Sequence, residues 1–313
     1  MAKIVITEQI DPAGVALLTA AGHKVTELGL GGGVVITPEQ VGDADILLVR
    51  IAEVTRRLLE GCPKLKLVSK HGVGVDNIDM DAAKECGIAV TIAPGANSTS
   101  VAEHAFAMLI ALAKNLPTVC GKYREIGFAA KNCAPGIELT GKTLGIIGCG
   151  RIGSRIAKMA HGGFDMKVLA YDPYITEVPE GTELVSDRDR VFAESDFVTL
   201  HPLLNKETAG SVGAREFALM KPGAIFINCG RGPLIDEEAL IAALQNGHIG
   251  GAGLDVTAVE PCPPENPLFH MPNVLLTPHY APTTKEAAVA TSRIAAQNVL
   301  DFLAGKPVEG RLV

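Results

Sequence analysis

The chain has 313 residues, of which 47% are hydrophobic and 20% charged, so it can build the cores of about two domains and is not a disordered chain. Its net charge is −7 and it carries no basic stripe, which argues against a nucleic-acid partner. Seven cysteines, an odd number without CxxC spacing, predict neither a metal site nor a disulfide framework and favour reduced thiols in the cytoplasm.

The sequence shows no targeting or membrane segment. The first four residues lead directly into a strand-like run, without the pattern of a signal peptide. The most apolar helical stretch, residues 101–116, contains Glu103, His104 and Lys114 and is shorter than the ~20 apolar residues that span a bilayer. We therefore expect this stretch to be a buried helix, and we expect no membrane partner.

The first hundred residues alternate short β-branched runs with helical segments. Capping-box patterns at residues 37–40 and 100–103 predict two helix starts. Such alternation is typical of an α/β fold with a parallel sheet. The predicted strands are residues 4–6, 24–28, 46–49, 67–69 and 89–92.

A second series of strands and helices begins near Thr143 and predicts a doubly wound nucleotide-binding domain. Its six predicted strands are residues 143–147, 167–171, 197–200, 224–228, 251–255 and 274–277. A last helix, residues 284–303, ends at Gly305 with Pro307 beyond, which is a usual helix exit.

A glycine-rich motif follows the first strand of the second series. Gly148, Gly150 and Gly153 form a GxGxxG pattern that opens a helix, and the next strand ends in Asp172. The first glycine permits a tight turn, the second lets the backbone approach a pyrophosphate, and the third allows close helix–strand packing. Because the carboxylate of Asp172 would repel a 2′-phosphate, the motif predicts NAD as the cofactor. The predicted cofactor-binding residues are Gly148, Gly150, Arg151, Ile152, Gly153, Asp172, His201, Pro202, Cys229, Gly230 and Asp255.

Three later strands are followed by an Arg, a Glu and a His. Arg231 can hold a substrate carboxylate through a bidentate fork, and His279 can exchange a proton with a carbonyl oxygen. Glu260 can hydrogen-bond the other ring nitrogen of the histidine and favour its protonated form. Gly232 and Gly230 are expected to leave room for substrate and nicotinamide. The trio predicts hydride transfer at carbon 2 of a 2-oxo acid, without a metal.

His201 is the rival proton donor, because it also ends a strand. No carboxylate lies nearby in sequence on the loop that follows it. We expect this ring to line the cofactor pocket instead.

Six stretches together resemble the D-isomer-specific 2-hydroxyacid dehydrogenases, in particular the phosphoglycerate dehydrogenase-like branch in a short form without a regulatory domain. They are residues 72–79, 97–103, 148–153, 228–236, 253–261 and 277–283. The resemblance makes Arg231, Glu260 and His279 the catalytic residues. It also implies a Rossmann NAD-binding domain, residues 99–285, and a flavodoxin-like discontinuous substrate domain, residues 1–98 and 286–313, with catalysis in the cleft between them.

The resemblance also implies a homodimer, for which the apolar helix from Val101 is a candidate interface or hinge. It places substrate binding on Arg50, which would contact a distal phosphate, on His71, and on the loop of Gly72, Val73 and Gly74. Successive amides of that loop would form an anion nest, although a plain turn is the alternative.

Three departures from the family pattern, Ile51, Thr257 and Tyr280, leave the substrate open. One alternative is a hydroxypyruvate, glyoxylate or sulfolactate-type reductase. The other is an NAD-sensing, partner-binding protein of the same fold.

Overall fold

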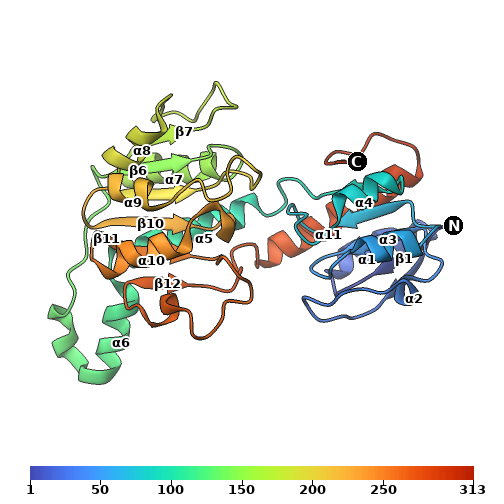
Figure 1. Cartoon of the computed structure of the whole chain (residues 1–313), viewed down its shortest axis with the longest axis horizontal. Coiled ribbons are helices and arrows are strands. Elements are labelled where there is room, and N and C mark those ends of the chain that lie inside the picture. The colour runs from blue at the N-terminus through green and yellow to red at the C-terminus, as the bar shows by residue number, and fades with distance from the viewer. The chain divides into compact units, whose positions relative to one another are not determined.

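The computed structural model describes residues 1–313, which divide into two compact units. One unit joins Met1–Asn97 to Thr283–Val313, and the other is Ser98–Pro282. The boundary near residue 98 lies one residue from the predicted one, and the boundary near residue 285 lies three residues from it. Each unit is an α/β structure with helices on both faces of a parallel sheet, as predicted (Figure 1).

The first unit has a five-stranded sheet in the order β2-β1-β3-β4-β5, the flavodoxin-like order. All five predicted strands are present, with ends that shift by one residue at most. The strands are β1 (Lys3–Ile6), β2 (Lys24–Glu27), β3 (Ile46–Val49), β4 (Leu67–Lys70) and β5 (Ala89–Thr91).

Two helices cover one face of this sheet and three cover the other. They are α1 (Pro12–Ala20) with α11 (Lys285–Leu303), and α2 (Pro38–Val41), α3 (Arg56–Gly61) and α4 (Met80–Glu85). The C-terminal helix is tied to the sheet by polar bonds as well as by apolar packing. Ser69 Oγ donates to the carbonyl of Ala295 at 3.0 Å, and Asn298 Nδ2 donates to that of Ile92 at 2.7 Å.

The second unit has a seven-stranded sheet in the order β12-β11-β10-β9-β6-β7-β8. Its strands are β6 (Thr143–Ile147), β7 (Lys167–Tyr171), β8 (Thr182–Leu184), β9 (Phe197–Leu200), β10 (Ala224–Asn228), β11 (Ile249–Leu254) and β12 (Val274–Leu276). The sequence prediction missed β8. This strand is three residues long, lies at an edge and is only partly buried, so its sequence has no apolar run that would reveal it.

The helices of the second unit pack in two layers, α5 with α7 on one face and α8, α9 and α10 on the other (Figure 1). These helices are α5 (Ser98–Ala113), α7 (Gly153–Phe164), α8 (Arg188–Glu194), α9 (Ala214–Leu219) and α10 (Glu237–Gln245). Helix α6 (Leu116–Ile126) belongs to neither layer and has no buried residue. Three short 3₁₀ turns complete the unit: η1 (Gly127–Asn132), η2 (Gly232–Leu234) and η3 (Pro267–His270).

The apolar helix was expected at residues 101–116 with a capping box at Ser100, and both details were wrong. Helix α5 begins at Ser98, so Ser100 lies inside its first turn and is buried. The helix ends at Ala113 because Asn115 adopts a left-handed conformation (φ 50°), and α6 then begins in a new direction. The helix is buried, as expected, and no helix of the structure has the length and apolar character needed to cross a membrane.

Replacing Gly14 with alanine should destabilise the first unit. A Cβ at this position of α1 would lie 2.6 Å from the backbone oxygen of Ser292 on α11, so the two helices would have to separate. We expect a loss of about 1–3 kcal/mol in the free energy of unfolding, measured by urea titration. As the control, Gly162→Ala places its Cβ in open space on α7 and should stabilise by about 0.5–1 kcal/mol. Equal urea midpoints for Gly14→Ala and the wild type would contradict this packing.

Candidate active site

The three motif glycines have different structural roles at the turn between β6 and α7. Gly148 has a φ of 86°, and a Cβ there would lie 2.6 Å from the backbone nitrogen of Pro202. A Cβ on Gly153 would lie 2.3 Å from the carbonyl oxygen of Gly148. A Cβ on Gly150, in contrast, would meet no atom within 4 Å. Two glycines therefore serve chain packing, while Gly150 leaves open space where a pyrophosphate can approach the backbone at the start of α7.

Asp172 lies at the end of β7 and is fixed beside the glycine motif. Its carboxylate accepts hydrogen bonds from the amides of Cys149 and Tyr174, both at 3.0 Å. The position suits an acceptor for ribose hydroxyls, as the sequence predicted. Cys149 is buried, and burial raises the pKa of its thiol, in keeping with a packing role. Arg151 is exposed, and Ile152 packs against the core below α7.

His201 and Pro202 follow β9 and pack against the glycine turn. The Nε2 atom of His201 lies 2.8 Å from the hydroxyl of Thr199, while its Nδ1 is buried and has no hydrogen-bond partner in the structure. Burial lowers the pKa of His201 to about 3, so the ring is neutral near pH 7. A neutral ring at this place fits the lining of a cofactor pocket and makes a poor proton donor.

The loop after β10 presents Arg231. The buried side chain of Asn228 accepts from the amide of Gly230 at 3.0 Å and donates to the carbonyl of Arg231 at 2.9 Å. Arg231 Nη1 in turn donates to the carbonyl of Gly230 at 2.8 Å. Cys229 is buried with its sulfur 3.9 Å from that of Met108, and burial raises its pKa, so this thiol is part of the core.

Glu260 and His279 form a hydrogen-bonded pair. His279 Nδ1 and Glu260 Oε2 are 2.8 Å apart, and the Thr257 amide donates to the other carboxylate oxygen at 3.3 Å. Partial burial acts to raise the pKa of Glu260. The bonds from His279 and Thr257 and the nearby charge of Arg231 outweigh that effect and hold this pKa below its ordinary value. An ionised Glu260 therefore holds the ring, and the structure brings all three predicted catalytic residues together in the second unit.

Asp255 anchors the loop that carries His279. Its buried carboxylate accepts from the amides of Tyr280 at 2.7 Å and Ala281 at 2.8 Å, and from the hydroxyl of Thr277 at 2.5 Å. These bonds hold His279 itself in a left-handed conformation (φ 52°), which non-glycine residues seldom adopt. The sequence predicted cofactor binding for Asp255 and gave no sign of this structural role, because its partners lie more than 20 residues away.

His104 was not among the predicted site residues, yet it belongs to the same network. Its Nε2 lies 3.1 Å from the hydroxyl of Thr277 and 3.6 Å from Asp255 Oδ1, and its ring contacts that of Tyr280 edge-on. The helix α5 thus contributes a polar side chain to the loop of the predicted catalytic histidine.

Gly232 does not leave room for substrate, which corrects the sequence interpretation. A Cβ at this position would lie 1.8 Å from the carbonyl oxygen of Thr257, so the glycine lets two loops pack directly against each other. One of these loops carries Arg231 and the other carries Glu260. The absence of a side chain is what allows the two charged groups to approach.

The predicted substrate residues of the first unit follow β3 and β4. Arg50 is exposed, and the turn of Gly72, Val73 and Gly74 is partly buried, with Gly72 at a φ of 148°. His71 Nε2 lies 2.8 Å from the hydroxyl of Ser292. Burial, followed by the charge of Arg50, lowers the pKa of His71 to about 4, so it acts as a neutral hydrogen-bonding group.

Comparison with known proteins identifies the family. Residues 106–281, more than half of the chain, match the family model described as D-isomer specific 2-hydroxyacid dehydrogenase, NAD binding domain. The chain is also 39% identical to the glyoxylate reductase of Thermococcus litoralis, over 97% of this chain and 94% of that protein. The chain belongs to this dehydrogenase family. The prediction of an NAD-binding domain of the Rossmann type is thereby confirmed.

Two further relatives of the family show the extent of the similarity. The D-3-phosphoglycerate dehydrogenase of Methanocaldococcus jannaschii is 42% identical over 99% of this chain, but the chain spans only 59% of that protein. A solved D-lactate dehydrogenase from Aquifex aeolicus, complexed with NAD and lactic acid, superposes with a TM-score of 0.84 at 31% identity, over 96% of each chain.

The depressed pKa of His71 should make stability depend on pH. Below about pH 6.5 the unfolded chain protonates this ring, whereas the folded chain does not until about pH 4. The free energy of unfolding should therefore fall between pH 7 and pH 4.5 by roughly 2 kcal/mol more in the wild type than in His71→Gln. Urea titrations at the two pH values measure this difference, and parallel losses in both proteins would contradict the assignment.

Proposed function

We propose that the chain is an NAD-dependent oxidoreductase that transfers a hydride between nicotinamide and carbon 2 of a small D-2-hydroxy or 2-oxo acid. The observation that carries the proposal is the 2.8 Å pair of His279 and Glu260 beside Arg231, in a domain of the NAD-binding family. A carboxylate binder, a proton donor and an orienting carboxylate are the groups that this reaction requires.

Each member of the trio has a separate task in the proposed mechanism. The guanidinium of Arg231 binds the carboxylate of the substrate and fixes its orientation. His279 donates a proton from Nε2 to the carbonyl oxygen during reduction and recovers it in the reverse direction. The ionised Glu260 accepts from Nδ1, which fixes the tautomer and the orientation of the ring. NAD held at the glycine turn would supply the hydride for carbon 2, or accept it in the reverse direction.

The residues of the glycine turn would hold the cofactor. Gly150 and the first turn of α7 would receive the pyrophosphate, and Asp172 would receive the ribose hydroxyls. The neutral ring of His201 would line the same pocket.

All seven cysteines are free thiols, which supports a reducing compartment such as the cytoplasm.

A phosphoglycerate dehydrogenase-like substrate is the first candidate, because relatives of that name match nearly the whole chain at about 40% identity. Arg50 would bind the distal acidic group. A glyoxylate or hydroxypyruvate reductase is the second candidate, because the relative named glyoxylate reductase is matched over 94% of its own length.

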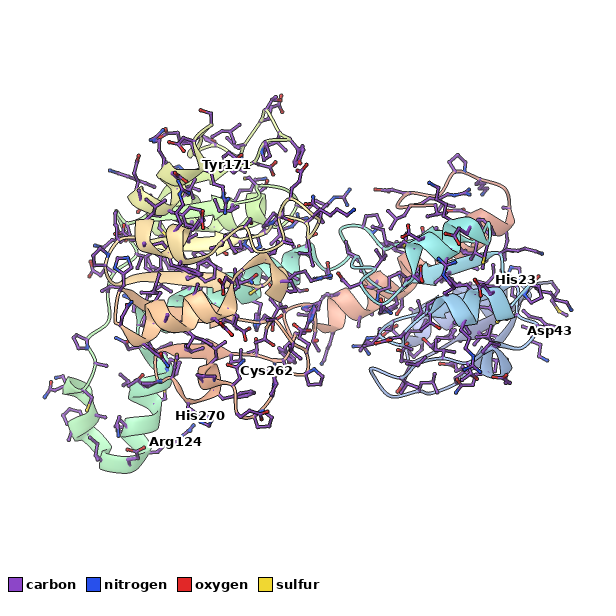
Figure 2. The ribbon with its side chains drawn as sticks, viewed as in Figure 1. His23, Asp43, Arg124, Tyr171, Cys262 and His270 are labelled. Carbon is purple, nitrogen blue, oxygen red and sulfur yellow. The ribbon has the colours of Figure 1, made fainter.

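A homodimer is also part of the proposal, with a different interface from the one predicted. The helix that begins near Val101 packs most of its surface into the core of its own unit and exposes only a narrow stripe at Thr99, Glu103 and Ala107. The next helix, α6, has no buried residue and extends away from the sheet with Arg124 on it (Figure 2). With η1 it exposes four large apolar side chains, Leu116, Tyr123, Ile126 and Phe128. We propose that a second copy of the chain covers this arm.

Activity on a panel of 2-oxo acids, followed by loss of NADH absorbance, tests the reaction. His279→Ala should lower kcat/KM by about 10²- to 10⁴-fold, because the proton donor is lost. His201→Ala should act mainly through the KM for NADH. If His201→Ala abolishes turnover and His279→Ala does not, the assignment of the proton donor is wrong.

Charge introduced on the arm should separate the dimer. In Phe128→Asp the carboxylate would have to be buried against the second copy, so the variant should sediment as a monomer in analytical ultracentrifugation. Tyr174→Asp, at an equally exposed aromatic of the same unit, is the matched control and should leave the mass unchanged. A wild-type protein that sediments as a monomer would remove this part of the proposal.

A further inference from the structure

Glu8 is a buried acidic residue to which the sequence assigned no role. It follows β1, and its side chain is only 5% exposed. Its carboxylate accepts from the amides of Arg50 at 2.9 Å and Ile51 at 2.8 Å, from the amide of Ala52, and from the hydroxyl of Thr7. Each carboxylate oxygen receives two bonds, so all four acceptor positions are filled. The loop after β3 therefore has three successive amides bound to one buried charge.

Two more buried or half-buried side chains hold the carbonyl groups of the same loop. Lys70 Nζ donates to the carbonyl of Arg50 at 2.6 Å and to Asn77 Oδ1 at 2.5 Å. Asn77 Nδ2 donates to the carbonyl of Ala52 at 2.7 Å. Lys70 is itself only 8% exposed. The peptide groups of Arg50 are thus bound on the amide side by a buried carboxylate and on the carbonyl side by a buried ammonium group.

The side chain of Arg50 is exposed although its backbone is fixed in this way. Burying a carboxylate and an ammonium group has a high desolvation cost, which their bonds to the amides and carbonyls of the loop offset. Fixing the backbone reduces the number of directions that the guanidinium can take, so less freedom is lost when it binds an anion. Burial is the main cause of the lowered pKa of neighbouring His71; the charges of Arg50 and Lys70 lower it further and the charge of Glu8 opposes them, so two positive groups and one negative group lie at this end of the sheet.

We propose that Glu8, together with Lys70 and Asn77, is a positioning residue that fixes Arg50 for the distal acidic group of the substrate. The inference rests on the proposed function and extends it, since it assigns the preference for a phosphorylated substrate to a buried residue that does not contact it. Glu8 would act only through Arg50.

The test compares kcat/KM for hydroxypyruvate 3-phosphate and for hydroxypyruvate. A glutamine at position 8 has one acceptor oxygen and turns its NH₂ donors towards backbone amides, so Arg50 loses its fixed position. Glu8→Gln and Arg50→Ala should each lower the preference for the phosphorylated substrate about tenfold. In the double variant the preference should be little lower than in Arg50→Ala alone, because Glu8 acts only through Arg50. Glu8→Asp keeps the charge and should restore part of the preference. Glu53→Gln, at an exposed glutamate of the same loop, is the matched control and should keep the preference.

A second variant and a second readout separate this proposal from folding and from turnover. Asn77→Ala releases the same loop from the other side without unpairing the buried carboxylate, and it should show the same loss of preference if Glu8→Gln does not fold. Calorimetric titration with 3-phosphoglycerate reports binding even if no 2-oxo acid is reduced, which would refute only the proposed function. Affinity should fall in Glu8→Gln as it does in Arg50→Ala. Three results would each overturn the inference. Glu8→Gln could lower kcat/KM equally for both substrates, its effect could add fully to that of Arg50→Ala, or the wild type could show no preference for the phosphorylated substrate.

Discussion

The structure depends on how the backbone amides at the carboxyl edge of each parallel sheet are satisfied. Beyond the strand ends, the backbone amides of the loops no longer have hydrogen-bond partners on a neighbouring strand. A buried amide without a partner costs free energy. In this chain polar side chains at the ends of the same or neighbouring strands replace those partners. Glu8 binds the loop after β3, Asn228 the loop of Arg231, and Asp255 the loop after β12. Asp172 does the same for the glycine turn. The loops that bear the proposed chemistry are therefore fixed by the sheet beneath them.

This constraint explains why the proposed catalytic groups can be charged and still lie close together. Arg231 and Glu260 stand on two loops that touch because Gly232 has no side chain, and Glu260 stays ionised because His279 and Arg231 lower its pKa. His279 keeps a seldom-used backbone conformation because Asp255 binds the two amides that follow it. The site is thus arranged before substrate arrives, which is the condition for efficient electrostatic stabilisation.

The sequence predicted what is encoded locally. Strand ranges, the glycine motif and the order of Arg231, Glu260 and His279 after successive strands are visible in short windows, and the strands agree with the structure to within about two residues. The rest depends on residues distant in the chain. Glu8 binds amides more than 40 positions away, and Gly232 is explained only by the carbonyl of Thr257. Strand β8 was missed because a short, partly exposed edge strand carries no hydrophobic pattern.

The central claim is that Glu260 holds the ring of His279 in place through the hydrogen bond at Nδ1, so that Nε2 can exchange a proton with the substrate. The most direct measurement is kcat/KM for reduction in the wild type, in Glu260→Ala and in Glu260→Gln. Glu260→Ala removes the acceptor for Nδ1 and should lower kcat/KM by about 10- to 100-fold, whereas Glu260→Gln keeps an acceptor oxygen and should lose less. A Glu260→Ala variant with the kcat/KM of the wild type would contradict the role of Glu260 in the site.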